Sequence, residues 1–263
     1  MADNWINVQR VRDACRLTGL GAGDRIIDVG CGPLGALPIF HEVVGPSGTV
    51  VGLDENEQLL RVAKGILRKR GFDSVMLIER DINQLPAGDL LPPGPFDAAY
   101  CRLLLINQTD PANTLRRMAS LVRPSGYIIA HELLDDLTYP VFDPPVPAFS
   151  RLRDLWRELL RRNGITADAA RHFAELSEQA GLRQVSQQGF FSADPRDAPA
   201  FIQSDGLAVI LSIAGALRHH GLANEIEISE LASELEEATS VTYRCFFSWI
   251  FVELIAQVPG SAA

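Results

Sequence analysis

The sequence has 263 residues, of which 47% are hydrophobic, and its formal net charge is −9. This length and apolar content allow one large domain or two small ones, and no apolar stretch reaches the roughly eighteen residues that a membrane helix needs. The acidic balance disfavours a nucleic-acid backbone as the main partner, and the polar start from Met1 to Arg12 lacks signal-peptide character, so we expect a cytoplasmic protein.

The first predicted elements are a helix and a strand that ends in a glycine-rich turn. Apolar residues over 5–18 have helical spacing, which predicts a leading helix within residues 1–19. Residues 26–35 then run from an apolar strand into a turn with three glycines within six residues, and an apolar helix follows over 36–44. Glycine accepts positive φ and lets a ligand approach the backbone, so the turn is a candidate ligand site. An ordinary connection between a strand and a helix is the alternative.

Asp28 decides which ligand suits this turn. The glycine spacing matches the dinucleotide fingerprint, with the acidic Asp54 about twenty positions further on. A carboxylate at Asp28, two residues before the first glycine, would however repel a pyrophosphate by several kcal/mol. S-adenosylmethionine carries a sulfonium, an ammonium and ribose hydroxyls, so one site can use both Asp28 and Asp54. An NAD-dependent oxidoreductase is the alternative that the glycine spacing favours.

Strands and helices then alternate along the chain. Strands are predicted over 49–54, 74–79, 96–101 and 127–132, with 102–107 continuing the fourth strand, and helices over 56–70 and 111–122. Asp54 and Asp81 follow strands directly, at the edge where ligands of open α/β sheets bind, although Asp81 can equally cap the turn after it. Later helices are predicted over 149–162, 168–180, 201–217 and 229–239, and later strands over 182–191 and 241–255. We therefore expect an α/β fold with a doubly wound, seven-stranded, mostly parallel sheet.

Two irregular segments, 133–165 and 195–240, interrupt the alternation. We expect one domain over 1–263 in which these segments are lid or substrate-binding insertions at the carboxyl edge of the sheet. Their apolar and aromatic side chains, Trp156 and Phe201 among them, suggest a pocket for a small organic molecule, although they can also simply close the core. The apolar C-terminal run can support a homodimer or a higher homo-oligomer. The four cysteines are far apart without C-x-x-C spacing, so we expect free thiols and no metal.

Five short motifs follow one another between residues 20 and 132. They are Asp28-Val29-Gly30-Cys31-Gly32-Pro33-Leu34-Gly35, Gly52-Leu53-Asp54, Arg80-Asp81-Ile82, Cys101-Arg102-Leu103-Leu104-Leu105 and Arg123-Pro124-Ser125-Gly126. Together they resemble the class I S-adenosylmethionine-dependent methyltransferases, and within these the ubiquinone/menaquinone-type and small-molecule methyltransferases. The resemblance implies an enzyme that binds S-adenosylmethionine and methylates a small molecule. The apolar insertions suggest that this molecule is a hydrophobic metabolite, for instance one of secondary metabolism.

The same resemblance implies which residues bind the cofactor. In that family the glycine turn holds the methionine part, the acid after the second strand binds ribose, the acid after the third contacts adenine, and the end of the fourth strand faces the amino-acid portion. The predicted cofactor-binding residues are Asp28, Gly30, Cys31, Gly32, Asp54, Glu55, Leu59, Asp81, Ile82, Cys101 and Arg102. Pro33 departs from the family by removing a backbone donor, and residues 106–108 replace an acid-histidine pair that is common after the fourth strand.

A catalytic base is needed only if the acceptor must lose a proton, because methyl transfer is an in-line displacement at an activated carbon. His131, Glu132, His219 and His220 are candidate bases, and we predict His131, with a structural role as its alternative. The residues leave open whether oxygen, nitrogen or carbon is methylated. A non-methylating protein on the same cofactor-binding scaffold is a further alternative. A nucleic-acid or protein methyltransferase is disfavoured, because the chain lacks a basic face and an Asn-Pro-Pro-aromatic run.

Overall fold

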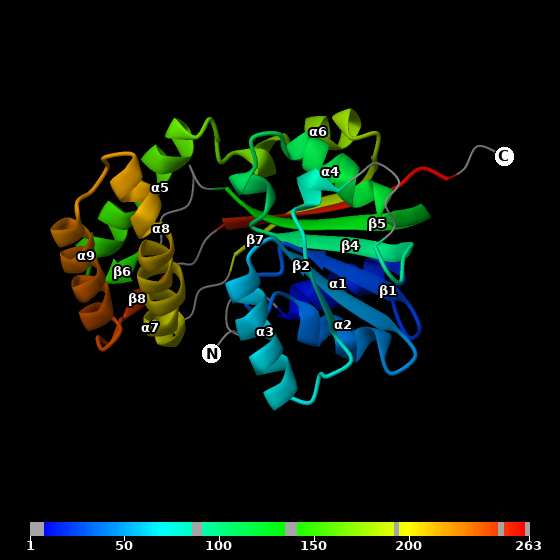
Figure 1. Cartoon of the computed structure of the whole chain (residues 1–263), viewed down its shortest axis with the longest axis horizontal. Coiled ribbons are helices and arrows are strands. Elements are labelled where there is room, and N and C mark those ends of the chain that lie inside the picture. Colours follow the sequence, from blue (N-terminus) through cyan, green and yellow to red (C-terminus); the bar gives the residue numbers. More distant parts are fainter. Residues whose placement is uncertain (1–7, 86–90, 135–140, 192–194, 247–249, 261–263) are drawn as a thin grey trace.

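The computed structural model describes residues 8–85, 91–134, 141–191, 195–246 and 250–260 (Figure 1). Its centre is a seven-stranded sheet in the order β3-β2-β1-β4-β5-β9-β7. The strands are β1 (Arg25–Val29), β2 (Thr49–Asp54), β3 (Met76–Glu79), β4 (Phe96–Arg102), β5 (Val122–Leu133), β7 (Arg183–Phe191) and β9 (Ile250–Gln257). Only β9 runs antiparallel to its neighbours, β5 and β7. The predicted doubly wound, mostly parallel sheet is therefore confirmed.

Helices cover both faces of this sheet. On one face, α1 (Val8–Thr18), α2 (Leu37–Val44) and α3 (Glu57–Lys69) enclose a cluster of buried side chains that includes Ile26, Phe40 and Tyr100. On the other face, α4 (Pro111–Ser120) and α6 (Phe173–Gln179), with the short turn η5 (Ala169–His172), enclose a second cluster around Ile27 and Leu115. Figure 1 shows the two helical layers below and above the sheet. Both sides of the central strands are buried, which is why their sequences are nearly continuous apolar runs.

The remaining elements form a unit beside the sheet, which we call the cap (residues 141–165 and 195–246). It contains α5 (Pro147–Arg162), η6 (Pro195–Asp197), α7 (Ala198–Phe201), η7 (Ile202–Leu207), α8 (Ala208–His219), α9 (Glu225–Ala238) and the two-stranded sheet of β6 (Phe142–Asp143) and β8 (Cys245–Phe246). A third cluster of buried side chains lies mostly in the cap and includes the stacked rings of Phe149 and Phe201. These segments overlap the predicted insertions, whose role as a lid stays a prediction, as does the extent of the domain.

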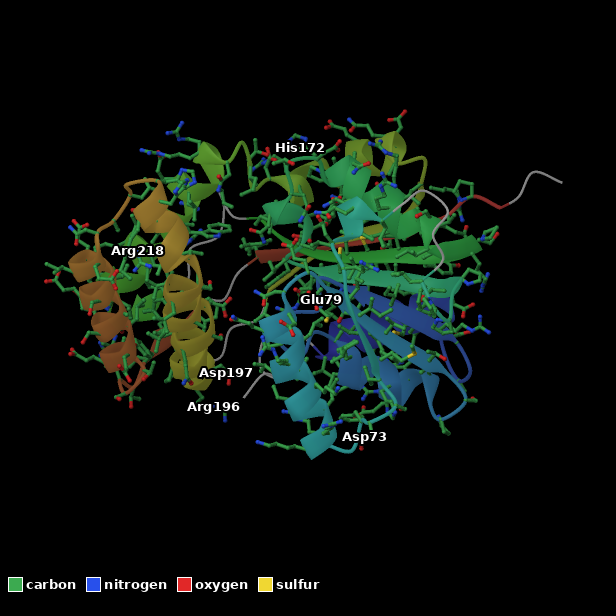
Figure 2. All side chains as sticks on the ribbon, in the orientation of Figure 1. Asp73, Glu79, His172, Arg196, Asp197 and Arg218 are labelled. Carbon is green, nitrogen blue, oxygen red and sulfur yellow. The ribbon has the colours of Figure 1, made fainter. Side chains whose placement is uncertain are left out.

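The long helix of the cap corrects one expectation. From Pro195 to His219 it is long and apolar enough, by length and composition, to cross a membrane. The expectation that no stretch reaches that length is therefore wrong. Arg196 and Asp197 lie at its start and Arg218 near its end (Figure 2). A core helix satisfies the same criteria, and buried side chains such as Phe201 and Ile210 pack it into the cap.

Two strand predictions also differ from the structure. Arg102 is the last residue of β4, and residues 103–107 do not continue the strand, because the chain leaves the sheet and forms the short turn η3 (Leu105–Asn107). The run 241–255 contains β8 of the cap and most of β9, not one strand. Since β9 lies between β5 and β7, most of this apolar run lies inside the sheet, and a homo-oligomer supported by it stays a prediction.

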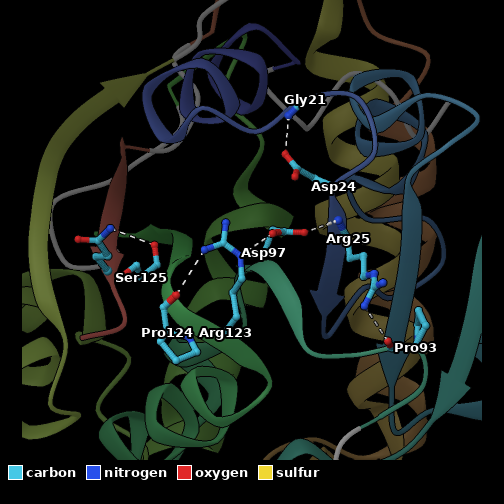
Figure 3. Close-up of polar contacts among 9 residues, drawn as sticks. Gly21, Asp24, Arg25, Pro93, Asp97, Arg123, Pro124 and Ser125 are labelled. Atoms are coloured by element: carbon cyan, nitrogen blue, oxygen red, sulfur yellow. Dashed lines mark hydrogen bonds and ion pairs between the residues drawn. The ribbon is translucent and has the colours of Figure 1, made fainter. Parts of the chain in front are cut away.

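The amino edge of the sheet is closed by polar contacts, which Figure 3 shows. The carboxylate of Asp97 accepts hydrogen bonds from the backbone N–H of Arg25 at 2.8 Å and from Nε of Arg123 at 2.6 Å. The Arg25 guanidinium in turn donates to the carbonyl of Pro93 at 3.2 Å. These contacts join the starts of β1, β4 and β5, and the cavities described below lie at the opposite, carboxyl edge.

Candidate functional site

The glycine turn between β1 and α2 has a backbone that only glycine adopts without strain. Gly30, Gly32 and Gly35 have φ values of 69°, 57° and 55°. A Cβ on Gly35 would lie 2.3 Å from Oδ2 of Asp28, and one on Gly30 would lie 3.0 Å from Cδ1 of Leu104. The turn can therefore approach both the Asp28 carboxylate and the chain after β4 only because side chains are missing from it.

Asp28 holds this turn from the inside. Its side chain is 1% exposed, and Oδ2 accepts a hydrogen bond of 2.7 Å from the backbone N–H of Ala36, at the start of α2. Burial raises the pKa of Asp28 to about 7, while the Ala36 hydrogen bond and the nearby Arg102 guanidinium oppose that rise. The carboxylate thus lies next to the turn, as the sequence predicts, but it is directed at α2 and not at a cavity.

Asp54, at the end of β2, connects the turn to the next helix. Its Oδ2 accepts from the backbone N–H of Gly32 at 2.8 Å, and its Oδ1 accepts from the N–H of Asn56 at 2.9 Å. Asn56 caps α3 by accepting from the N–H groups of Gln58 and Leu59. One carboxylate therefore fixes the position of two loops that face the same edge of the sheet.

A cavity of about 270 Å³, which we call the polar cavity, opens at this edge. It is lined by Val29, Gly30, Leu53, Asp54, Glu55, Arg80, Asp81, Ile82, Asn83, Leu104, Asn107 and Gln108. Burial raises the pKa of Glu55, and the carboxylates of Asp81 and Asp54 raise it further. Three carboxylates and one guanidinium make the wall suited to a cation or to hydroxyl groups and unsuited to a diphosphate.

Five of the predicted cofactor-binding residues line this cavity. They are Gly30, Asp54, Glu55, Asp81 and Ile82. Asp28, Cys31, Gly32, Leu59, Cys101 and Arg102 are not among its lining residues, and the thiols of Cys31 and Cys101 are buried. These six are not part of the wall of this cavity, and their contact with the cofactor stays a prediction.

Sequence reasoning missed seven lining residues. They are Val29, Leu53, Arg80, Asn83, Leu104, Asn107 and Gln108. Most of them flank a predicted residue in the chain, and that proximity was the available signal. Asn83 and Gln108 also hydrogen-bond each other, with the Asn83 Nδ2 donating to the Gln108 Oε1 at 2.8 Å, which joins the loops after β3 and β4.

The turn after β4 is held by one buried carboxylate, that of Glu132. It accepts from the backbone N–H groups of Leu104, Leu105 and Ile106 at 2.9, 2.8 and 3.2 Å. Burial raises the pKa of Glu132 to about 7 against the effect of these three donors. Leu103, just before them, has a φ of 54°, which is strained for a residue with a side chain. The hydrogen bonds to Glu132 offset that strain and explain why residues 103–107 leave the sheet.

A second cavity, of about 170 Å³, lies between this turn and the cap, and we call it the apolar cavity. It is lined by Leu103, Ile106, Asn107, Leu133, Leu152, Arg153, Trp156, Asp205 and Val209. Asn107 lines both cavities, and the consecutive residues Leu103 and Leu104 line the apolar and the polar cavity respectively. The strained turn after β4 is thus the partition between the two.

His131 does not occupy the place expected of a catalytic base. Its side chain is 3% exposed, its Nδ1 lies 3.1 Å from the hydroxyl of Tyr100, and its Nε2 lies 2.9 Å from Oε2 of Glu253. Burial lowers the pKa of His131, although Glu253 opposes this. His131 lines neither cavity, because β9 places Glu253 directly beside it. In this geometry His131 joins β4, β5 and β9, which favours its structural role, and a role as catalytic base stays a prediction.

The other candidate bases also lie away from the cavity walls. Glu132 is fully buried under the turn after β4. At the end of α8, His219 is exposed and His220 is half-buried, and neither residue lines a cavity described above. Among the residues that the structure describes, no group of three or more His, Cys, Asp or Glu side chains can hold a metal ion.

Comparisons with known proteins agree with this geometry. A family model described as a methyltransferase domain matches residues 20–154. The demethylmenaquinone methyltransferase of Anoxybacillus flavithermus is 26% identical over 186 residues, which cover 68% of this chain and 75% of that protein. The ubiquinone/menaquinone biosynthesis C-methyltransferase UbiE of Vibrio vulnificus is 30% identical over 184 residues, 66% of each chain. The match to the demethylmenaquinone methyltransferase of Geobacillus kaustophilus spans 50% of that protein.

Solved structures show the same fold over nearly the whole chain. The YcgJ protein of Bacillus subtilis has a TM-score of 0.58 at 16% identity and covers 97% of this chain and 99% of that chain. The [4+2]-cyclase SpnF has a TM-score of 0.57 at 18% identity and covers 97% of this chain and 82% of that chain. The likeness therefore includes the cap as well as the sheet.

Proposed function

Since the chain belongs to the methyltransferase-domain family, as a class I S-adenosylmethionine-dependent methyltransferase, we propose that it methylates a small, hydrophobic metabolite bound in the apolar cavity. The observation that carries this proposal is the contact of the two cavities at Asn107, which lines both. A methyl donor in one cavity and an acceptor in the other would meet at that residue.

The polar cavity suits the donor, and we propose that it holds S-adenosylmethionine. The carboxylates of Asp54 and Glu55 lie where ribose hydroxyls can donate to them, and Asp81 with Ile82 would contact adenine. Gly30, which leaves the wall open beside Leu104, would face the methionine part. Asp28, Cys31, Gly32, Leu59, Cys101 and Arg102 would support the cofactor through the turns that they hold.

When bound, S-adenosylmethionine supplies a methyl carbon that is already activated by the sulfonium. The main contribution of the protein is then alignment, because the acceptor atom, the methyl carbon and the sulfur must lie in line. Leu103, Leu104 and Asn107 would set that line, since they lie on the partition between the cavities. The apolar walls of the acceptor cavity exclude water from the reacting atoms.

The acceptor side of the proposal rests on the cap. Leu152, Trp156 and Val209 give the second cavity an apolar wall that suits a ring or a short hydrophobic body. The name of one relative, demethylmenaquinone methyltransferase, also indicates a small-molecule acceptor. We propose that the protein acts in the cytoplasm on such a small molecule, from secondary metabolism, without nucleic acid or membrane as a partner.

Calorimetric titration tests the donor assignment. We expect S-adenosylmethionine to bind and NAD to show no binding. Asp54→Asn should lower the affinity for the cofactor by about 10- to 100-fold. The cavity wall loses a charged acceptor, and the hydrogen bond from the N–H of Gly32 loses its charged partner. Glu57→Gln, on the exposed start of α3, is the matched control and should bind as the wild type does.

A panel of aromatic and aliphatic acceptors tests the transfer itself, with release of S-adenosylhomocysteine as the readout. Release with an aromatic acceptor supports the proposal. Tight cofactor binding without any release would favour a non-methylating protein on the same scaffold. Binding of NAD in place of S-adenosylmethionine would contradict the proposed donor.

A further inference from the structure

The apolar cavity contains one carboxylate among its lining residues, that of Asp205. Asp205 lies in η7, a stretch of π-helix within the long cap helix, and such stretches occur frequently at functional sites. The next residue, Gly206, is buried, and a Cβ there would lie 3.2 Å from Leu235 on α9 and 3.4 Å from Phe149 on α5. Close packing against two helices therefore fixes the backbone that carries Asp205.

The Asp205 carboxylate keeps one oxygen available to a ligand. Oδ2 lies 2.6 Å from Oγ of Ser204, which donates to it. Within the described part of the chain, Oδ1 accepts no hydrogen bond. Because the side chain lines the cavity, that oxygen can accept a hydrogen bond from a molecule bound there.

The charged groups near Asp205 come from two elements, α5 and β4. Arg153 of α5 lines the same cavity, and Arg102, at the end of β4, is near enough to affect the Asp205 carboxylate. The contact from α9 is the apolar Leu235. Burial raises the pKa of Asp205, while Ser204 and Arg102 oppose the rise. A carboxylate with a raised pKa accepts a proton more readily than an ordinary aspartate does.

We propose that Asp205 is the catalytic base of this enzyme and that its acceptors are phenols or enols, whose acidic hydroxyl donates to Asp205. This inference rests on the proposed function, and it replaces His131 in the role of base. A cavity with both a carboxylate and a guanidinium favours a neutral hydroxyl over an amine. Arg153 would repel an ammonium group, whereas it stabilises the oxygen charge that appears when a hydroxyl loses its proton.

The reaction balances without another reagent. The hydroxyl proton moves to Asp205, and the electron pair left on oxygen forms the new bond to the methyl carbon. The carbon–sulfur bond breaks, and its electron pair stays on sulfur, which becomes a neutral thioether. Attack through a conjugated carbon gives the same sum, because that carbon then releases its own hydrogen as a proton and the oxygen regains one. Asp205 finally loses its proton to solvent.

Binding of simple probes tests this base without turnover. An apolar cavity of roughly 150 Å³ accepts a benzene ring, so 4-methylphenol and 4-methylanisole, which differ only in the hydroxyl hydrogen and one methyl group, are suitable. We expect the wild type to prefer 4-methylphenol by about tenfold in ligand-observed NMR titrations at pH 7. Asp205→Leu, of similar size, should bind both probes within about twofold of each other.

Asp154→Asn is the matched control, because it removes an exposed carboxylate from α5 next to Arg153. It should keep the tenfold preference. Thermal unfolding and S-adenosylmethionine affinity report whether Asp205→Leu is folded, and if it is not, Asp205→Asn takes its place. Retention of the preference in a folded Asp205 variant overturns the inference. Tighter binding of benzylamine than of 4-methylphenol to the wild type also overturns it, because the cavity would then select cations.

The pH profile of methyl transfer, with a phenol that the acceptor panel identifies, gives the second test. We expect the acid limb of kcat/KM in the wild type to be lost in Asp205→Asn, with kcat lower by about 100-fold or more, and to be partly restored in Asp205→Glu. An unchanged acid limb in Asp205→Asn contradicts the base but not the methyltransferase. Failure of the wild type to bind S-adenosylmethionine would instead contradict the proposed function.

Discussion

The polar and the apolar cavity are built in different ways. The polar cavity is made by the ends of β1, β2, β3 and β4 and the turns that directly follow them, so its lining residues lie within a few positions of a strand end. The apolar cavity combines the turn after β4 with Leu152 of α5 and Asp205 of the long cap helix, which are far apart in the sequence. We infer that the first is set by local turn geometry and the second by the packing of the cap.

Substitutions in the two cavities should therefore have different effects on binding. A substitution in the polar cavity should change affinity for the cofactor, and one in the apolar cavity should change which acceptor binds. Glu132 is the exception, because its carboxylate holds the partition that both cavities share.

Glu132→Ala should have the largest effect. It leaves the buried N–H groups of Leu104, Leu105 and Ile106 without their acceptor, at a cost of about 1–3 kcal/mol each. The strained Leu103 would also relax, so both cavities should lose their shape. We expect lower stability in chemical denaturation and loss of both cofactor and 4-methylphenol binding. Glu132→Gln keeps an acceptor oxygen and should be milder, and equal effects of the two variants would contradict the role of these hydrogen bonds.

Gly35→Ala should act on the polar cavity alone. The new Cβ would lie 2.3 Å from Oδ2 of Asp28, and a positive φ of 55° is costly for alanine, so we expect a loss of about 3 kcal/mol of unfolding free energy. Cofactor affinity should fall with it, while 4-methylphenol still binds to the folded fraction. Gly65→Ala on α3 is the control. Apart from the chain neighbours of Gly65 and the backbone of its own helix, no atom lies within 4 Å of a Cβ added there, so the unfolding free energy should rise by about 0.5–1 kcal/mol. A Gly35 variant as stable as wild type would show that the turn tolerates a side chain.

The sequence predicts most of the sheet, because strands buried on both faces are apolar runs that end in glycine or an acid. It also predicts Gly30, Asp54, Glu55, Asp81 and Ile82 in one wall, since adjacent strand ends meet at one edge. These inferences need only local pattern and the topology that the pattern implies.

The rest depends on contacts that no local pattern reveals. Leu103 leaves the sheet because Glu132, from the next strand, binds the N–H groups that follow it. His131 is enclosed because β9 returns antiparallel and places Glu253 opposite it. Asp205 lines the apolar cavity from a π-helical stretch of the cap helix, far along the chain from the turn after β4. A residue's role was therefore mistaken or missed wherever a distant segment decided its surroundings.

Asp28→Asn should have the smallest effect. It changes a residue that holds the glycine turn but does not line the polar cavity. The pKa of Asp28 is raised from 3.8 to about 7 by burial, so the folded protein binds this proton more tightly than the unfolded chain does. The contribution of Asp28 to the unfolding free energy is therefore greatest below pH 4 and falls as the pH rises from about 4 to about 7.

Asparagine keeps an acceptor for Ala36 and removes the buried charge. The stability of Asp28→Asn relative to the wild type should accordingly improve between pH 4.5 and 7.5 in urea denaturation, by about 1 kcal/mol or more. The pKa of Glu132 is also raised, but Glu132 is present in both proteins, so its effect cancels from the difference in their unfolding free energies. A relative stability that stays constant or worsens over this range would mean that Asp28 is ionised in the folded protein at little cost, and that the turn is held by a charged and not a neutral acid.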